Sequence, residues 1–295
     1  MIPIKTLCLR FDILARIVML PDHENGMDVT LGPSAQVRWK AIALPPEHGG
    51  WGFLLEPVAL GLLVAPSWTG FFWGVAALGA FLMQHPLKLA YTDRRRGRRY
   101  ARTVAAERVL FAYLALALAG LLPALALGGL TPLIPLLLAA PLALVQVINL
   151  LSNRGRELAR ELAGALTLAA LVAAIALAGG AAYQTALGLW AVLAARDVPS
   201  IVYVRERLRL EKGKPAARGA VLALNALALA AIALLAALGW VPWLAAAAIA
   251  FLFVRAAYGV SPWRRPARPQ TIGFLELGMG ALTVLLTALG VGLGL

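Results

Sequence analysis

The stretch that decides the fold runs from residue 158 to residue 214 and reads LARELAGALTLAALVAAIALAGGAAYQTALGLWAVLAARDVPSIVYVRERLRLEKGK. It holds two apolar runs of about 20 residues each, which is the length a helix needs to span the hydrocarbon core of a bilayer. The link between the runs, Gly179-Gly180, is uncharged, whereas arginine occurs at both outer ends and lysine follows at the C-terminal one. The stretch therefore predicts a helical hairpin whose open ends lie on the positively charged side of a membrane.

The same alternation continues along the whole chain. All 27 Lys and Arg residues fall in five stretches, which are 5–40, 88–108, 154–160, 196–218 and 255–268. The intervening connections contain neither residue, and they are 67–69, 128–131, 179–180 and 240–243. By the positive-inside rule this pattern indicates a multispanning inner-membrane protein whose basic loops and N-terminus are cytoplasmic and whose C-terminus is external.

The apolar runs give an all-α polytopic membrane protein with nine transmembrane helices. We expect them at about 50–66, 70–91, 107–127, 131–151, 158–178, 181–204, 217–238, 241–259 and 272–294. The short external connections predict tight antiparallel hairpins of the first and second, third and fourth, fifth and sixth, and seventh and eighth segments. Residues 46–295 thus form the transmembrane domain. Residues 1–45 are a cytoplasmic N-terminal segment, for which a surface helix over 4–20 and a mis-annotated start codon are alternative interpretations.

Composition narrows the class of protein. Hydrophobic residues make up 61% of the chain and mean hydropathy is +0.80, well above a soluble protein. The formal charge of +13 lies in loops beside apolar runs, so anionic membrane lipids fit it better than nucleic acid. A single cysteine, Cys8, excludes an internal disulfide framework, and the three histidines lack the spacing of a zinc site.

Polar residues within or beside the apolar runs are candidates for a functional site, because ionisable groups at membrane depth are costly. In chain order, these pocket candidates are Glu47, His48, Glu56, His85, Asp93, Asn153, Arg154, Glu157, Glu161, Arg196, Asp197, Ser200, Tyr203, Arg205 and Glu276. Alternative interpretations are a neutral or arginine-paired structural role for Glu56, internal salt bridges for the segment 153–161, and a structural ion pair for Arg196 and Asp197. We expect a polar pocket, open to the cytoplasm, between the first, second, fifth, sixth and ninth segments.

The deepest charges are expected to meet. Glu56, Glu276 and Arg196 lie at similar depth in their apolar segments. Two acids and one base at equal depth cost least when they pair. We therefore predict that Arg196 contacts Glu56, Glu276 or Asp197.

Four motifs taken in order resemble the YwiC-like family of bacterial membrane proteins. They are Glu47-His48-Gly49-Gly50-Trp51 with Pro57, the segment 153–161, the sequence SIVYVRER at 200–207, and PQTIGFLE at 269–276. The similarity extends over about residues 45–290. It implies a bacterial membrane protein and carries no established activity.

A more distant resemblance is to the UbiA-type intramembrane prenyltransferases. Proteins of that superfamily are nine-helix bundles in which two Asp-rich motifs hold Mg²⁺ and an isoprenoid diphosphate. Asp93 and Asp197 stand at the corresponding places here, so the resemblance makes them weak magnesium candidates and implies Mg²⁺ as the cofactor. Arginine can also hold a diphosphate directly through bidentate hydrogen bonds.

Three functions follow as hypotheses, with membrane lipids as partners and no protein partner indicated. The first is a protein that binds or acts on an anionic isoprenoid or another amphipathic lipid, in the manner of a degenerate prenyltransferase. The second is a transporter or permease, although such proteins usually place ionisable residues at the bilayer midplane. The third is a non-catalytic membrane component that assists a respiratory complex.

Overall fold

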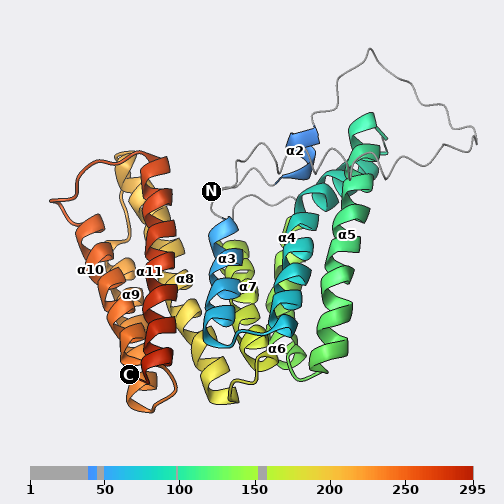
Figure 1. Ribbon diagram of the computed structural model, residues 1–295. Coiled ribbons are helices and arrows are strands. Elements are labelled where there is room, and N and C mark those ends of the chain that lie inside the picture. The colour runs from blue at the N-terminus through green and yellow to red at the C-terminus, as the bar shows by residue number, and fades with distance from the viewer. Residues whose placement is uncertain (1–38, 45–49, 98, 152–157, 295) are drawn as a thin grey trace, which may run out of the picture.

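The computed structural model describes residues 39–44, 50–97, 99–151 and 158–294, and the elements in this part of the chain are helices (Figure 1). In order they are α2 (Trp39–Ala43), α3 (Gly50–Val64), α4 (Trp68–Arg95), α5 (Ala101–Gly128), α6 (Leu133–Leu151), α7 (Leu158–Ala178), α8 (Tyr183–Glu211), α9 (Arg218–Ala237), α10 (Trp243–Val260) and α11 (Pro269–Leu293). The proposed N-terminal segment, residues 1–45, lies almost wholly outside the described residues.

Each of the nine predicted apolar segments forms a helix, α3 to α11, within the described part of the chain. Six helices there are long and apolar enough to cross a membrane: α5, α7, α8, α9, α10 and α11. Two more, α3 and α6, are apolar but shorter, and α4 is not among the candidates. The class of helical membrane protein is confirmed, while the count of nine spans stays a prediction.

Several helices extend beyond the apolar runs at the basic end of the bundle. The clearest case is α8, which continues seven residues past the expected end at 204 to Glu211. Ion pairs one turn apart stabilise this extension, Arg207 with Glu211 at 2.9 Å and Arg209 with Glu206 at 3.7 Å. Hydropathy alone missed it because the extra turns are amphipathic and charged.

The long helices stand side by side, with α3 to α7 on one side and α9 to α11 on the other (Figure 1). The turns that join α3 to α4, α5 to α6, α7 to α8 and α9 to α10 gather at the end opposite the basic loops (Figure 1). Gly180 in one of these turns has φ +87°, a left-handed conformation that glycine adopts without strain.

One of the four expected hairpins is wrong. Although only a short turn joins α5 to α6, α5 packs along α4, and α6 packs along α7. Small residues allow the close approach of α4 and α5, since Gly79 lies against Ala117 and Gly120 lies against Ala76. Such contacts between small residues are a common way to bring membrane helices together.

Helix α8 connects the two sides of the bundle. Its Leu189 and Leu193 pack with Leu60 of α3, Val172 of α7 and Val284 of α11 in one apolar cluster. On its other side Val192 packs with residues of α9 and α10. Side chains on α8 are therefore placed to contact several helices at once, which is what positions the polar site described next.

Candidate functional site

Arg196 is the centre of a buried ion-pair network. It lies on α8 and is only 3% exposed. Its Nη2 is 2.8 Å from Oε1 of Glu56 on α3, and its Nη1 donates a hydrogen bond of 3.0 Å to Oδ1 of Asp197. Its Nη2 also donates to the backbone carbonyl of Glu276 on α11, at 3.0 Å. The predicted contact of Arg196 with the deep acids is confirmed.

A second arginine completes the network. Nη1 of Arg255, on α10, is 2.8 Å from Oε1 of Glu276, and its Nη2 donates to Oε2 at 3.1 Å. The guanidinium also donates to Oγ of Ser200 at 3.3 Å and stacks 4.2 Å from the ring centroid of Tyr203. We use the name ion-pair network for Arg196, Asp197, Glu56, Glu276 and Arg255.

Close packing encloses the network. Gly280 of α11 faces Glu56 and Arg196, and a Cβ at that position would collide with both side chains. The ring of Phe53 lies beside the Arg196 guanidinium, with its centroid 5.6 Å away. Buried charges survive at such a place only when they are paired and hydrogen-bonded. The deep acids thus meet in a packed network, whereas the expected open pocket between α3, α4, α7, α8 and α11 stays a prediction.

The pairing within the network is uneven. Three carboxylates face two guanidinium groups, so the fully ionised network carries a net charge of −1. Arg196 Nη2 lies 2.8 Å from Oε1 of Glu56, but neither carboxylate oxygen of Glu56 accepts a well-aligned hydrogen bond from a described residue. Glu56 is thus a buried acid that is held by a single ion pair.

Asp93 belongs to a separate pair at the basic end of α4. Its carboxylate accepts hydrogen bonds from Nε and Nη2 of Arg102, at 3.0 and 2.7 Å, and from Oγ1 of Thr103, at 2.9 Å. These bonds, those from Arg102 first, hold the pKa of the Asp93 carboxyl below its usual range. Asp93 lies beyond the apolar part of α4, and its pairing fastens the loop between α4 and α5.

The two weak magnesium candidates are each engaged by an arginine of their own, Asp93 by Arg102 and Asp197 by Arg196. Within the described residues no group of three or more acidic, histidine or cysteine side chains is arranged to hold a metal ion. The arrangement around both carboxylates is that of ion pairs, and Mg²⁺ stays a prediction from the resemblance.

The other candidates are dispersed. His85 bonds through Nε2 to the carbonyl of Ala41 in α2, and Glu161 pairs with Arg205 at 3.0 Å in a partly exposed contact between α7 and α8. Five candidates lie outside the described residues: Glu47, His48, Asn153, Arg154 and Glu157.

Arg255 is the functional candidate that sequence reasoning missed. The basic stretch 255–268 begins with it, but the residue lies inside α10 with its side chain 12% exposed. The sequence contains a signal that could have identified it, because the residues around Arg255 are apolar. In Phe253-Val254-Arg255-Ala256-Ala257 a single charge lies within an apolar run. An arginine in that setting needs an acid partner, and the nearest acids in sequence lie on other helices.

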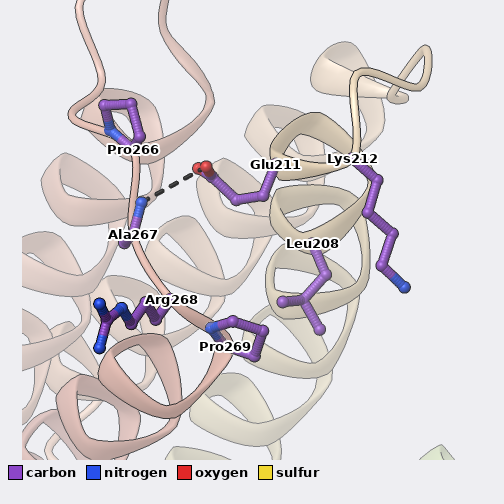
Figure 2. A pocket seen from close by; sticks show the side chains of 7 residues that line it. All are labelled: Leu208, Glu211, Lys212, Pro266, Ala267, Arg268 and Pro269. Carbon is purple, nitrogen blue, oxygen red and sulfur yellow. Dashed lines mark hydrogen bonds between the residues drawn. The ribbon is translucent and has the colours of Figure 1, made fainter.

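Two cavities lie at the basic end of the bundle. One, of about 390 Å³, is lined by Leu208, Glu211, Lys212 and residues 266–269, and Figure 2 shows Glu211 reaching across it to the backbone nitrogen of Ala267. The other, of about 410 Å³, lies around the loop between α8 and α9. Its lining is Leu210, Gly213, Lys214, Pro215, Ala216, Arg218 and Arg264, with three cations and no acid.

The outer surface of the bundle is apolar along the helices and carries tryptophans at the helix ends. Large apolar side chains such as Phe111, Leu137, Leu227 and Phe274 are exposed on the outside of the bundle. Exposed tryptophans mark helix ends on both sides, Trp68 and Trp243 at the charge-free end and Trp263 at the basic end. Apolar helices with aromatic residues at their ends define a helical integral membrane protein.

Over residues 44–176 the chain matches the family model described as YwiC-like protein. The resemblance to the YwiC-like family is thereby confirmed for the range that includes α3 to α6 and most of α7, with Glu56 and Asp93 among its residues. The motifs at 200–207 and 269–276 lie beyond the matched range. No curated protein and no solved structure matches the chain.

Proposed function

We propose that this membrane protein binds an anionic amphipathic lipid, such as an isoprenoid phosphate, at the basic end of its bundle. The observation that carries the proposal is the cavity lined by Lys214, Arg218 and Arg264. A phosphate group is strongly attracted to several cations around one cavity, and arginine binds it through paired hydrogen bonds. The neighbouring cavity is less suited to an anion because Glu211 lies in it.

The setting of this cavity favours a lipid over a soluble anion. Trp263, in the loop between α10 and α11, is largely exposed at the same end of the bundle. Tryptophan at a helix end is typical of the membrane interface, where lipid head groups lie. A head group at the cavity would leave its apolar chain free to lie along the exposed leucines and phenylalanines of the outer surface.

The proposal includes a topology: nine spans in a UbiA-like arrangement in the bacterial inner membrane, with the basic loops in the cytoplasm and the C-terminus external. A cytoplasmic basic end faces the leaflet whose negative surface potential attracts lysine and arginine.

The test compares lipid binding by matched variants in detergent, with native mass spectrometry as the readout and a polyprenyl phosphate as the probe. Lys214→Gln with Arg218→Gln removes two cations from the cavity. Arg95→Gln with Arg96→Gln removes two exposed cations from the end of α4. A cation near an anionic head group contributes about 1 kcal/mol, so the cavity variant should bind about 30-fold more weakly.

The comparison separates site binding from general charge. Retained binding in the control variant, with loss in the cavity variant, supports the cavity. Equal weakening in both variants reveals nonspecific attraction to a basic protein and contradicts the proposal. Anionic phosphatidylglycerol and zwitterionic phosphatidylcholine serve as further probes. Equal binding of these two lipids also contradicts the proposal.

A further inference from the structure

We propose that the ion-pair network is a proton-binding site and that the carboxylate of Glu56 carries the proton. The argument starts from charge. Asp197, Glu56 and Glu276 face only Arg196 and Arg255, so one negative charge is left over when all five groups are ionised. An uncompensated charge in an apolar interior is strongly unfavourable, and a bound proton removes it.

The hydrogen bonds indicate which acid takes the proton. Glu276 accepts a hydrogen bond from Arg255 at Oε2 and forms an ion pair with it at Oε1, and Asp197 accepts a hydrogen bond from Arg196. Glu56 has one ion pair, at 2.8 Å from Arg196, and neither of its oxygens accepts a well-aligned hydrogen bond from a described residue. Hydrogen bonds to the charged form of an acid stabilise that form, so the acid with none is the first to be protonated.

Among the described residues, the helices packed against α3 supply no further cation to Glu56. From α8 it faces Arg196 and Asp197, and from α11 it faces Glu276, whose charge is matched by Arg255. Helices α7 and α4 also pack against α3, and their acids are paired with other arginines. Glu161 of α7 pairs with Arg205, and Asp93 of α4 pairs with Arg102. Within the described part of the chain, the balance of charge around Glu56 is therefore set by the network itself.

Proton binding would change how the two sides of the bundle are joined. The ionised carboxylate of Glu56 links α3 to α8 through Arg196. When a proton from water binds to Oε2, Glu56 becomes neutral and Arg196 keeps its bonds to Asp197 and to the carbonyl of Glu276. Glu56 lies six residues into α3, about 9 Å along the helix from its start, so the site is near the basic end.

Infrared spectroscopy of the purified protein in detergent tests this directly, because a protonated carboxyl group absorbs apart from a carboxylate. We expect a protonated-carboxyl band at neutral pH in the wild type, since unperturbed Asp and Glu are ionised there. The band should be lost in Glu56→Gln and kept in Glu161→Gln, a control that removes an acid outside the network. A band that survives Glu56→Gln overturns the assignment to Glu56.

A second variant tests the charge balance without touching Glu56. Asp197→Asn leaves two acids and two arginines, so Glu56 can ionise and the band should disappear at neutral pH. Persistence of the full band in Asp197→Asn overturns the proposal, as does a wild type without the band between about pH 5 and about pH 9. Thermal stability in detergent is measured as a function of pH and of salt. If it depends on sodium or potassium concentration and not on pH, the site binds a metal cation and the proton-binding proposal is contradicted.

Discussion

Replacing Arg196 with leucine removes the cation that the buried acids share. Arg196 is nearly inaccessible and contacts Glu56 at 2.8 Å, Asp197 at 3.0 Å and the carbonyl of Glu276 at 3.0 Å. The leucine side chain leaves Asp197 and Glu56 without their guanidinium partner. Breaking a buried ion pair in this way costs about 3–5 kcal/mol, because an unpaired charge remains in the interior.

The expected result is a large loss of thermal stability in detergent. If about 1 kcal/mol corresponds to 2–4 °C for a protein of this size, Arg196→Leu should lower the midpoint by roughly 6–20 °C. Helical circular dichroism during heating measures the midpoint, and unfolding in mixed micelles provides an independent free energy. Arg99→Leu is the control, since Arg99 is exposed and Glu107 keeps its contact with Arg94.

The control should change the free energy of unfolding by no more than about 1 kcal/mol, as is usual for an exposed ion pair. Equal midpoints for Arg196→Leu and Arg99→Leu would refute the reasoning, because a network that stabilises nothing cannot be the buried cluster described. A double variant adds a further check. Arg196→Leu combined with Glu56→Gln should be less destabilised than the sum of the single changes, since the two groups interact.

Three further predictions test other parts of the structure. Gly280→Ala should destabilise the protein by about 1–3 kcal/mol because its methyl group collides with the ion-pair network, whereas Gly278→Ala, with open space around it, should be neutral or stabilising by up to about 1 kcal/mol; thermal unfolding distinguishes them. The pKa of Asp93 is lowered by its arginine partner, so its stabilising effect is present above the unfolded value of about 4 and is lost as the pH falls through the folded value; stability curves of Asp93→Asn should lack this acid-induced loss. In a background without the native cysteine, Thr131→Cys should react with an impermeant reagent from outside the cell and Arg96→Cys should not, and the reverse pattern would overturn the proposed topology.

The nine helices were predictable because membrane helices have a strong signal in the sequence, an uninterrupted apolar run of sufficient length. The contacts of Arg196 were predictable for a related reason, since an arginine at membrane depth needs a nearby acid and the chain offers few. The extension of α8 to Glu211 was not predictable from hydropathy, because local ion pairs rather than apolar residues stabilise it.

The partner of Glu276 could not be derived from the sequence. Arg255 and Arg196 are both available to it, and the choice depends on how α10 and α11 pack, which no local pattern encodes. The packing of α5 on α4 illustrates the same limit. A short turn makes two helices neighbours in the chain, while the fit of small residues such as Gly120 decides which helices touch.

The charge-free turns have a consequence for biosynthesis. Under the proposed topology, the turns after α3, α5, α7 and α9 are the parts of the described chain that must be carried across the bilayer between helices. Moving a lysine, arginine or aspartate through the centre of the membrane costs about 2.5–3.5 kcal/mol per residue on insertion scales, and none of these turns contains one. The two helices joined by each turn can therefore enter the membrane together, also where, as for α5 and α6, they pack on other helices in the final fold, while their basic ends stay on the side where they were made. A single arginine introduced at the Gly179-Gly180 turn is enough to oppose that step, so the orientation of the protein would be decided before its helices pack.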